Sequence, residues 1–372
     1  MKNIVIILIV LFLSRCLFSP TIQTDNQIDS QIDSVFVAIV DTIRLVFAGD
    51  VMGHGMQITG AWRDGGDTCY NYYPSFQWVK DYILDFDIAV ANLEVTLAGP
   101  PYSGYPDFSS HKSLADALLD AGFNVLLTAN NHVLDRGKKG LERTLDVLDS
   151  IGMIHTGAFR DSIEWKENYP LLIEKNNFRL ALLNYTYDTN CYLWEKPNIV
   201  NYIDTLRMAN DLENAKSLNP DYIIVCVHWG DEYKNEENEK QRKVANFLAR
   251  HGCNLIVGAH PHVVQPLVKM NDSAYVAYSL GNFISNQRNR YRDGGITLEL
   301  TLTKTDSIVA LQSINYEPFW VYRYPKNGIS VFRLIRINDY LEYTERYPII
   351  SEIDKMLMMR FYEDTKEIMI SD

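Results

Sequence analysis

Short apolar runs alternate with longer amphipathic segments over much of the chain. The apolar runs are typical of buried strands and occupy residues 43–48, 88–91, 125–128, 222–227 and 255–257. Helical periodicity occupies residues 73–84, 114–121, 137–151, 205–218 and 239–251. Gly122 and Gly152 each follow one of these segments, which is where a helix C-cap is expected.

The second half of the chain is richer in strands. Apolar stretches separated by short polar turns predict three β-hairpins, at residues 171–174 and 178–184, 266–270 and 274–279, and 296–303 and 308–316. Strands that alternate with helices and then give way to hairpins indicate an α/β (α+β) sandwich with mixed sheets and helical outer layers. We expect this domain to cover residues 43–320 and a C-terminal extension with one helix to cover residues 321–372.

Residues 1–42 are expected to lie outside the folded domain. The apolar run Ile4–Leu13 follows a basic residue and has the length of a signal-peptide core. It leads into a segment similar to a bacterial lipoprotein cleavage box, in which Cys16 would be lipidated. Arg15 stands where a small residue is usual, so an uncleaved anchor is the alternative. We therefore predict an extracytoplasmic protein attached to the membrane through its N-terminus.

Composition restricts the classes of partner. The chain has 372 residues, of which 47% are apolar and 22% charged, as in a folded globular protein. A formal net charge of −12 argues against nonspecific binding to nucleic acid or to an anionic membrane surface. A polyanionic substrate would need metal ions or a local basic patch to offset the repulsion. Five cysteines in this length do not indicate a disulfide scaffold.

Residues that can bind metal ions follow the ends of several predicted strands. The ends of parallel strands meet at one edge of a sheet, where ligands gather. The mixture of imidazole, carboxylate and amide oxygen suits Mn, Fe or Zn. Six ligands are too many for one catalytic ion and suit two divalent ions that share a carboxylate. The candidate ligands are Asp50, Glu94, Asn131, His228, His260 and His262.

Several segments together resemble the CapA group of poly-γ-glutamate capsule-biosynthesis proteins, within the calcineurin-like metallophosphatase superfamily. They span residues 43 to 285, and their combination is specific. The segments are Phe47-Ala48-Gly49-Asp50, Ala91-Asn92-Leu93-Glu94, Thr128-Ala129-Asn130-Asn131-His132 with Asp135 and Gly137, Val227-His228-Trp229-Gly230 with Glu232, Gly258-Ala259-His260-Pro261-His262, and Tyr278-Ser279-Leu280-Gly281-Asn282-Phe283.

The resemblance implies a four-layer αββα sandwich with two mixed sheets and a dinuclear site. Asp50 and His262 would hold the first ion, and Glu94 or Asp50 would bridge. Asn131, His228 and His260 would hold the second ion. His132 would act on the reacting phosphoryl or acyl oxygen as a general acid or electrostatic stabiliser, and Asp135 is the second candidate catalytic residue.

Two positions depart from the phosphatase pattern. Met52 stands where the phosphatases usually place a metal-binding histidine, and His54 lies two residues further on. Glu94 stands where they carry aspartate. One ion would then bind more weakly, and phosphatase activity does not follow from the fold.

Three arginines recur at alternate positions after the last motif. In an extended loop, Arg288, Arg290 and Arg292 would share one face. Their guanidinium groups suit carboxylate or phosphate oxygens. We expect them, with Asn282 at the preceding strand end, to bind an anionic polymer. An ordinary solvated loop is the alternative.

Two functions fit these features. The first is an exported, metal-dependent hydrolase that acts on an amide, peptide or phosphoester bond in an anionic capsule or envelope polymer such as poly-γ-glutamate. The second is a non-catalytic accessory that binds the polymer or tethers it to the membrane proteins of a capsule synthase. The accessory would tolerate the loss of His132, because binding needs no leaving-group acid. A nucleotidase-type phosphoesterase would need a nucleotide pocket, which the sequence does not indicate.

Overall fold

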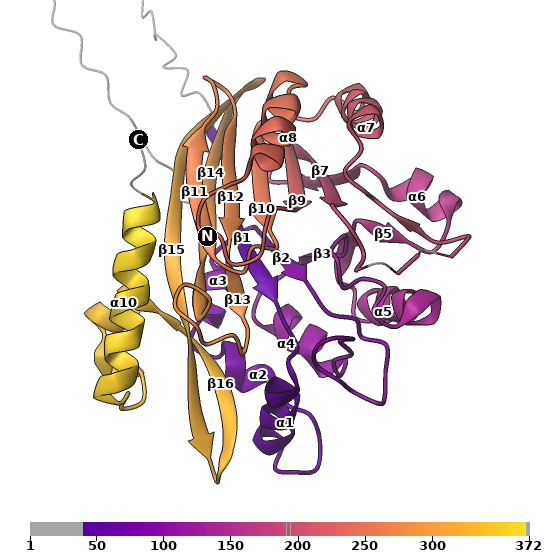
Figure 1. The fold of residues 1–372 in the computed structure, drawn as a ribbon. Helices are drawn as coiled ribbons and strands as arrows, with labels where there is room; N and C mark the ends of the chain where they lie inside the picture. Colours follow the sequence, from indigo (N-terminus) through magenta and orange to yellow (C-terminus); the bar gives the residue numbers. More distant parts are fainter. Residues whose placement is uncertain (1–39, 191, 194, 370–372) are drawn as a thin grey trace, which may run out of the picture. The chain divides into compact units, whose positions relative to one another are not determined.

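A computed structural model describes residues 40–190, 192–193 and 195–369, in which two β-sheets pack face to face (Figure 1). The expected signal segment and tether lie outside these residues, except for residues 40–42, which begin the first strand. Within the described ranges, no helix combines the length and apolar character that crossing a bilayer requires.

The first sheet is mixed. Its first four strands in sequence are parallel to one another and form one half. On the other side of β1, three consecutive strands joined by two hairpins form the antiparallel half. A short strand, β13 (Asn282–Ile284), runs parallel to the end of β1. The order is β16 (Ile329–Arg336), β15 (Ile308–Lys326), β14 (Gly294–Thr305), β1 (Val40–Val51), β2 (Ile88–Leu93), β3 (Val125–Leu127) and β4 (Ile154–Thr156).

The second sheet has four parallel central strands flanked by two antiparallel ones. Both antiparallel edges come from the hairpins that the sequence predicts. The order is β11 (Val264–Lys269), β12 (Tyr275–Leu280), β10 (Leu255–Ala259), β9 (Tyr222–His228), β7 (Phe178–Thr186) and β6 (Leu171–Lys175). A separate pair joins β5 (Ala158–Phe159) to β8 (Ile199–Val200).

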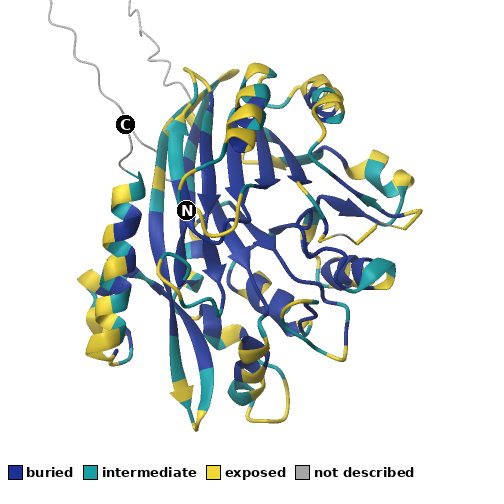
Figure 2. Cartoon of the chain, in the orientation of Figure 1, coloured by how far each residue is buried: buried dark blue, intermediate teal, exposed yellow. Residues whose placement is uncertain are grey.

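The alternation of side chains along the strands divides the core into layers. In β1, Leu45 and Phe47 pack between the two sheets, against residues such as Ile224 of β9. Val46 and Ala48 point to the other face and pack against the helices there. Both faces of the central strands are buried, and exposed residues lie on the outer sides of the helices (Figure 2). The predicted four-layer αββα sandwich is therefore confirmed.

Helices cover the outer face of each sheet. The first sheet is covered by α1 (Gly55–Asp64), α2 (Tyr73–Phe76), α3 (Lys80–Leu84), α4 (Ser113–Asp120) and α5 (Gly137–Ser150). The second is covered by α7 (Thr205–Ser217) and α8 (Glu239–Arg250), with α6 (Ser162–Asn168) beside β5. The single helix expected over residues 73–84 is two short helices joined by a turn, and neither α1 nor α6 was predicted.

The C-terminal part belongs to the same domain. The boundary expected after residue 320 lies inside β15, whose pairing with β16 extends the first sheet by another strand. The chain continues through α9 (Ile337–Glu342), a short 3-10 helix (Thr344–Arg346) and α10 (Glu352–Met369). Met358 and Phe361 of α10 pack into the layer between the sheets, and α10 contacts β15 and β11. Residues 321–369 thus complete the sandwich instead of forming an extension.

Candidate metal centre

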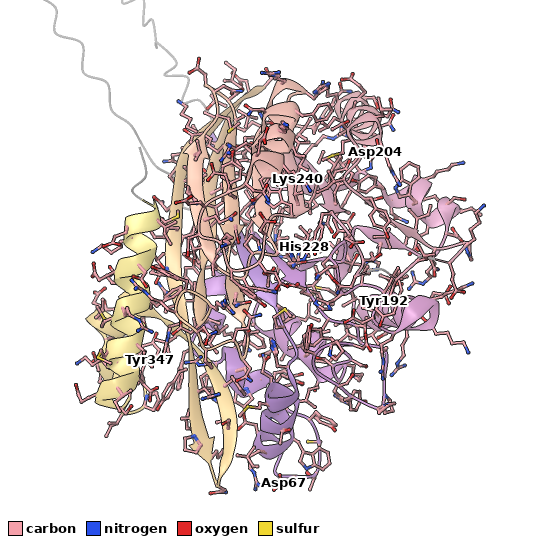
Figure 3. The ribbon with its side chains drawn as sticks, viewed as in Figure 1. Asp67, Tyr192, Asp204, His228, Lys240 and Tyr347 are labelled. Atoms are coloured by element: carbon pink, nitrogen blue, oxygen red, sulfur yellow. The ribbon has the colours of Figure 1, made fainter. Side chains whose placement is uncertain are left out.

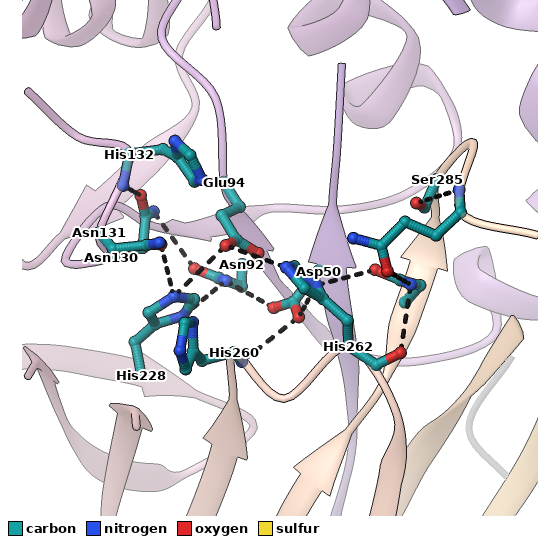
Figure 4. A network of polar contacts seen from close by, with 12 residues as sticks. Asp50, Asn92, Glu94, Asn130, Asn131, His132, His228, His260, His262 and Ser285 are labelled. Carbon is teal, nitrogen blue, oxygen red and sulfur yellow. Dashed lines mark hydrogen bonds and ion pairs between the residues drawn. The ribbon is translucent and has the colours of Figure 1, made fainter. Parts of the chain in front are cut away.

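The predicted ligands lie at the carboxyl ends of the central strands of both sheets. Asp50 pairs in register with Asn92 of β2 and Asn282 of β13, and His228 pairs with Ala259 at the end of β10. All six predicted ligands are buried, with side chains from both sheets converging on one place (Figure 4). The prediction that these strand ends meet is confirmed.

Five of the six form two overlapping groups that could each hold an ion. One consists of Glu94, His228 and His260, and the other of Asp50, Glu94 and His262. Within each group the candidate ligand atoms lie within 4.8 Å of one another. Glu94 belongs to both, as expected of a bridging carboxylate.

Asn131 adjoins the first of these groups. Its Oδ1 lies 2.8 Å from His228 Nε2, and that nitrogen lies 3.4 Å from Glu94 Oε1. Asn131 also donates from Nδ2 to Asn190 Oδ1 at 3.2 Å, which fixes the direction of its amide oxygen. The amide, imidazole and carboxylate therefore face a common point.

The donor set is incomplete without a cation. Both oxygens of the fully buried Glu94 carboxylate lack a hydrogen-bond donor within the described part of the chain, and so does His260 Nδ1. Burial, followed by the nearby Asp50 carboxylate, raises the pKa of Glu94 well above its usual value. Buried polar groups are normally paired, and buried charges are paired or bind metal ions. These residues fit a divalent transition metal centre.

The imidazoles of His228 and His260 are in the protonation state that a metal ion requires. Burial lowers the pKa of His228 well below its ordinary value and that of His260 to about 3, with neighbouring histidines contributing in the same direction. Burial would raise the pKa of Asp50, but hydrogen bonds from His262 and Asn92 outweigh it and lower that pKa. His228 and His260 are thus neutral and Asp50 is ionised at neutral pH.

The backbone at the two histidines that follow β10 is unusual. His260 has φ +100° and His262 has φ +57°, a region that residues other than glycine rarely adopt. Such conformations cost free energy, and they concentrate at functional sites where the surrounding structure imposes them. At this turn they direct both imidazoles into the same site.

Asn92 links the two groups and was quoted in a motif without a predicted role. Its Nδ2 donates to Asp50 Oδ1 at 2.8 Å and lies 3.2 Å from His228 Nδ1 (Figure 4). Because side chains alternate along a strand, Asn92 lies on the same side of β2 as Glu94. The spacing of two residues between Asn92 and Glu94 is the feature of the sequence from which the position of Asn92 could have been predicted.

Asn282 has a different role from the predicted contact with substrate. Its side chain is fully buried, and Oδ1 lies 3.1 Å from His262 Nδ1. Its Nδ2 donates to the backbone oxygens of His262 and Arg292, at 3.2 and 2.8 Å. Asn282 therefore orients a candidate ligand and is not accessible to a polymer.

The candidate catalytic residues form a hydrogen-bonded pair. His132 Nδ1 lies 2.8 Å from Asp135 Oδ2, which also accepts from the backbone N–H of Phe108 at 2.7 Å. The Phe108 ring packs edge-to-face against the imidazole at 4.7 Å. Asp135 thus holds the ring through Nδ1, and Nε2 is the remaining site for proton transfer.

The loop between β7 and β8 adds a residue that the sequence did not reveal. Asn190 Nδ2 lies 3.3 Å from His132 Nδ1, and Asn190 Oδ1 accepts from Asn131. Tyr192 lies on the same loop (Figure 3) and donates to Asp107 Oδ1 at 2.6 Å. A lone asparagine in a polar loop carries no periodicity or motif by which it could have been found.

The three arginines do not line one face, so that expectation is wrong. Arg288 Nη1 donates to the backbone oxygen of Val321, and Arg290 forms two hydrogen bonds with the Asp364 carboxylate on α10. The reason is a turn within the loop, which replaces the extended chain that alternation requires. Only Arg292 among the three stacks on an aromatic ring next to a candidate ligand, because its guanidinium lies over Tyr233 and that ring lies 6.1 Å from His262.

The position where the phosphatases usually place a metal-binding histidine belongs to the apolar core. Met52 is buried among the residues that pack the first sheet against its helices. His54 precedes α1, and its backbone N–H and Nδ1 both contact Gln57 Oε1. Neither residue belongs to the two groups of candidate ligands.

These features define a class of protein: an αββα sandwich with two overlapping groups of candidate metal ligands buried at the strand ends. The chain belongs to the bacterial capsule synthesis protein PGA_cap family, whose model matches residues 44–287. It is 28% identical over 265 residues to PGA biosynthesis protein CapA of Bacillus subtilis, covering 69% of this chain and 67% of that protein. It is 26% identical over 339 residues to capsule biosynthesis protein CapA of Bacillus anthracis, covering 86% and 72%. The predicted relationship to the CapA group is confirmed.

Solved structures of similar shape have much lower identity. Calcineurin-like phosphoesterase YfkN from Bacillus subtilis is 12% identical with a TM-score of 0.43, covering 88% of this chain and 99% of that one. NAD nucleotidase from Haemophilus influenzae is 12% identical with a TM-score of 0.48, covering 88% and 68%.

Proposed function

We propose that this protein is an exported, metal-dependent hydrolase of capsule or cell-envelope polymer metabolism, with poly-γ-glutamate or a similar anionic polymer as its substrate. Membership of the capsule synthesis family supports the process. The names of the two Bacillus relatives, which refer to PGA and to capsule biosynthesis, support the class of polymer. The reaction is inferred from the candidate metal centre.

The observation that carries this proposal is the buried carboxylate of Glu94, because it supports a metal centre. It has no hydrogen-bond donor among the described residues and belongs to both groups of candidate ligands. A carboxylate in a purely structural role would be paired. Two Mn, Fe or Zn ions would be held by Asp50, Glu94 and His262 on one side and by Glu94, Asn131, His228 and His260 on the other.

Bound ions would polarise the carbonyl or phosphoryl oxygen of the substrate and activate water. His132 would donate a proton to the leaving group from Nε2, because Asp135 occupies Nδ1. Asp135 keeps that imidazole in one orientation, assisted by the packing of Phe108. Asn92 and Asn282 position Asp50, His228 and His262 from behind.

A non-catalytic accessory that binds the polymer for a capsule synthase is the second candidate. It is favoured by the departure at Met52, an apolar residue packed in the core at the position where the phosphatases usually place a metal-binding histidine. Membrane attachment through the N-terminus would suit either function, since both act where the polymer leaves the cell.

Metal analysis and turnover separate the two candidates. The wild type, refolded with Mn²⁺ and Zn²⁺ and desalted, should retain up to two ions per chain and hydrolyse at least one of a panel of γ-glutamyl peptides, aryl phosphates and phosphodiesters. His132→Ala should retain the ions and lose about 10²- to 10⁴-fold in turnover, the usual contribution of a positioned acid. No bound metal would contradict the centre. Metal without turnover on any substrate would favour the accessory.

A further inference from the structure

One arginine beside the metal centre has no partner of opposite charge. Arg292 forms no ion pair and no side-chain hydrogen bond with any residue in the described ranges, and it is only partly buried. Arg290, two residues earlier, is neutralised by Asp364, with nitrogen–oxygen distances of 2.9 and 2.6 Å. In a chain with a net charge of −12, an uncompensated guanidinium at this place is unexpected.

A stack of aromatic rings connects Arg292 to the candidate ligands. The Arg292 guanidinium carbon lies 3.3 Å from the centre of the Tyr233 ring. That ring in turn lies 6.1 Å from the His262 imidazole with an interplanar angle of 27°. A cation held flat on an aromatic face keeps its N–H groups directed outward in the plane of the guanidinium. Tyr233 is 36% exposed, so solvent reaches the stack.

The backbone fixes both ends of this stack. The Arg292 carbonyl oxygen accepts from Asn282 Nδ2, and Asn282 also holds His262. The backbone N–H of Tyr233 donates to the Pro261 oxygen at 2.8 Å, next to the same histidine. The distance between the guanidinium and the metal site is therefore set by the residues that build the site.

The chemistry of this position selects a carboxylate. Arginine offers paired N–H donors that match the two oxygens of a carboxylate. In a γ-linked glutamyl polymer, each residue has a free α-carboxylate close to the γ-amide bond. A chain with that amide at the metal centre would place a neighbouring carboxylate within reach of the guanidinium stacked on Tyr233, whose ring lies 6.1 Å from His262.

We propose that Arg292, supported on Tyr233, is the recognition residue for a carboxylate of the anionic polymer next to the bond held at the metal centre. This assignment rests on the proposed function. It gives to Arg292 alone the role that the sequence analysis predicted for three arginines. Glu232 is the nearby acidic neighbour of Tyr233 and helps to raise the pKa of Tyr233 to about 12, after burial, while forming no ion pair with Arg292.

The test measures binding directly, so that it does not depend on turnover. Fluorescence anisotropy with a labelled oligo-γ-glutamate gives the Kd of the metal-loaded full chain at low and at physiological salt. Arg292→Ser should raise the Kd by about 10- to 100-fold, the value of a charged hydrogen-bonded pair. Arg292→Lys should lie between Arg292→Ser and the wild type, because it keeps the charge and loses the planar fork.

Arg290→Ser is the matched control, since it removes an arginine from the same loop that is already paired. It should bind the oligomer with nearly the wild-type Kd, and thermal unfolding should show that both variants are folded. Equal weakening by Arg290→Ser and Arg292→Ser, or wild-type affinity in Arg292→Ser, would overturn the assignment. So would a wild type that does not bind the oligomer at low salt. The proposed catalysis would then still be decided by metal content and by turnover of the aryl phosphates and phosphodiesters, which have no carboxylate for Arg292 to bind.

Discussion

Replacing Glu94 with Gln should change stability in opposite directions with and without metal. The substitution preserves shape and removes a charge that is fully buried and accepts no hydrogen bond from the described residues. Without metal, the charge of Glu94 is destabilising for two reasons, because burial removes it from water and because the ionised Asp50 carboxylate repels it. In the proposed centre, the same charge would be the shared ligand of both ions.

The expected magnitudes follow from burial and from mass action. Relieving a buried, uncompensated charge should stabilise the metal-free protein by about 1–3 kcal/mol, because the full cost of several kcal/mol is partly avoided by protonation. For a domain of this size, that corresponds to a rise in Tm of roughly 2–4 °C. An ion present at a thousand times its Kd stabilises the folded state by about 4 kcal/mol. The variant should lose most of that contribution, so its Tm in excess metal should fall below that of the wild type.

Differential scanning calorimetry with chelator, and again with excess Mn²⁺ or Zn²⁺, measures both effects. Glu317→Gln is the matched control, because Glu317 is also buried but accepts a hydrogen bond from Asn338 Nδ2 at 3.0 Å and lies outside the candidate centre. It should change the Tm by the same amount in both conditions. A uniform loss of Tm in Glu94→Gln, with and without metal, would refute the reasoning and make Glu94 a structural residue.

Two further predictions concern residues that support the site and the fold. Asn92→Ala should lower metal affinity by about 10- to 100-fold in isothermal titration, because the amide contacts both Asp50 and His228 from behind; unchanged affinity would mean that the strand alone positions the ligands. Arg333→Met should lower the free energy of unfolding in urea by about 3 kcal/mol without changing metal content, because it removes one of the two cations that neutralise the buried Asp64. A smaller loss would show that Lys326 suffices.

The layers and the ligands could be predicted because both depend on local patterns. The apolar run 43–48 alternates between the inter-sheet core and the helical face, so its burial on both sides was readable from composition alone. Asp50, Glu94 and His228 follow such runs directly, and the ends of parallel strands meet by topology. Neither inference needs knowledge of side-chain packing.

What could not be predicted depends on contacts between distant segments. The alternation of Arg288, Arg290 and Arg292 implied an extended loop, but Tyr291 has φ +73° and turns the chain. Asp364, the partner of Arg290, is 74 residues away in a segment without a motif. The domain boundary predicted after residue 320 was wrong for a similar reason. The strand β16 pairs with β15 and extends the sheet, although the amino-acid composition does not change at that point.

Met52 explains why the two groups of candidate ligands differ in size, because it stands where the phosphatases usually place a metal-binding histidine. Glu94, Asn131, His228 and His260 offer four residues to one ion, while Asp50, Glu94 and His262 offer three to the other. The Met52 side chain cannot supply the missing ligand by adopting another rotamer, because it packs in the apolar core between the first sheet and its helices. Catalytic ions keep open positions, whereas structural ions are fully enclosed by protein ligands. In the proposed hydrolase, Asp50, Glu94 and His262 would hold the ion that keeps an open position for the substrate, and the Tyr233 ring on which Arg292 stacks lies 6.1 Å from His262.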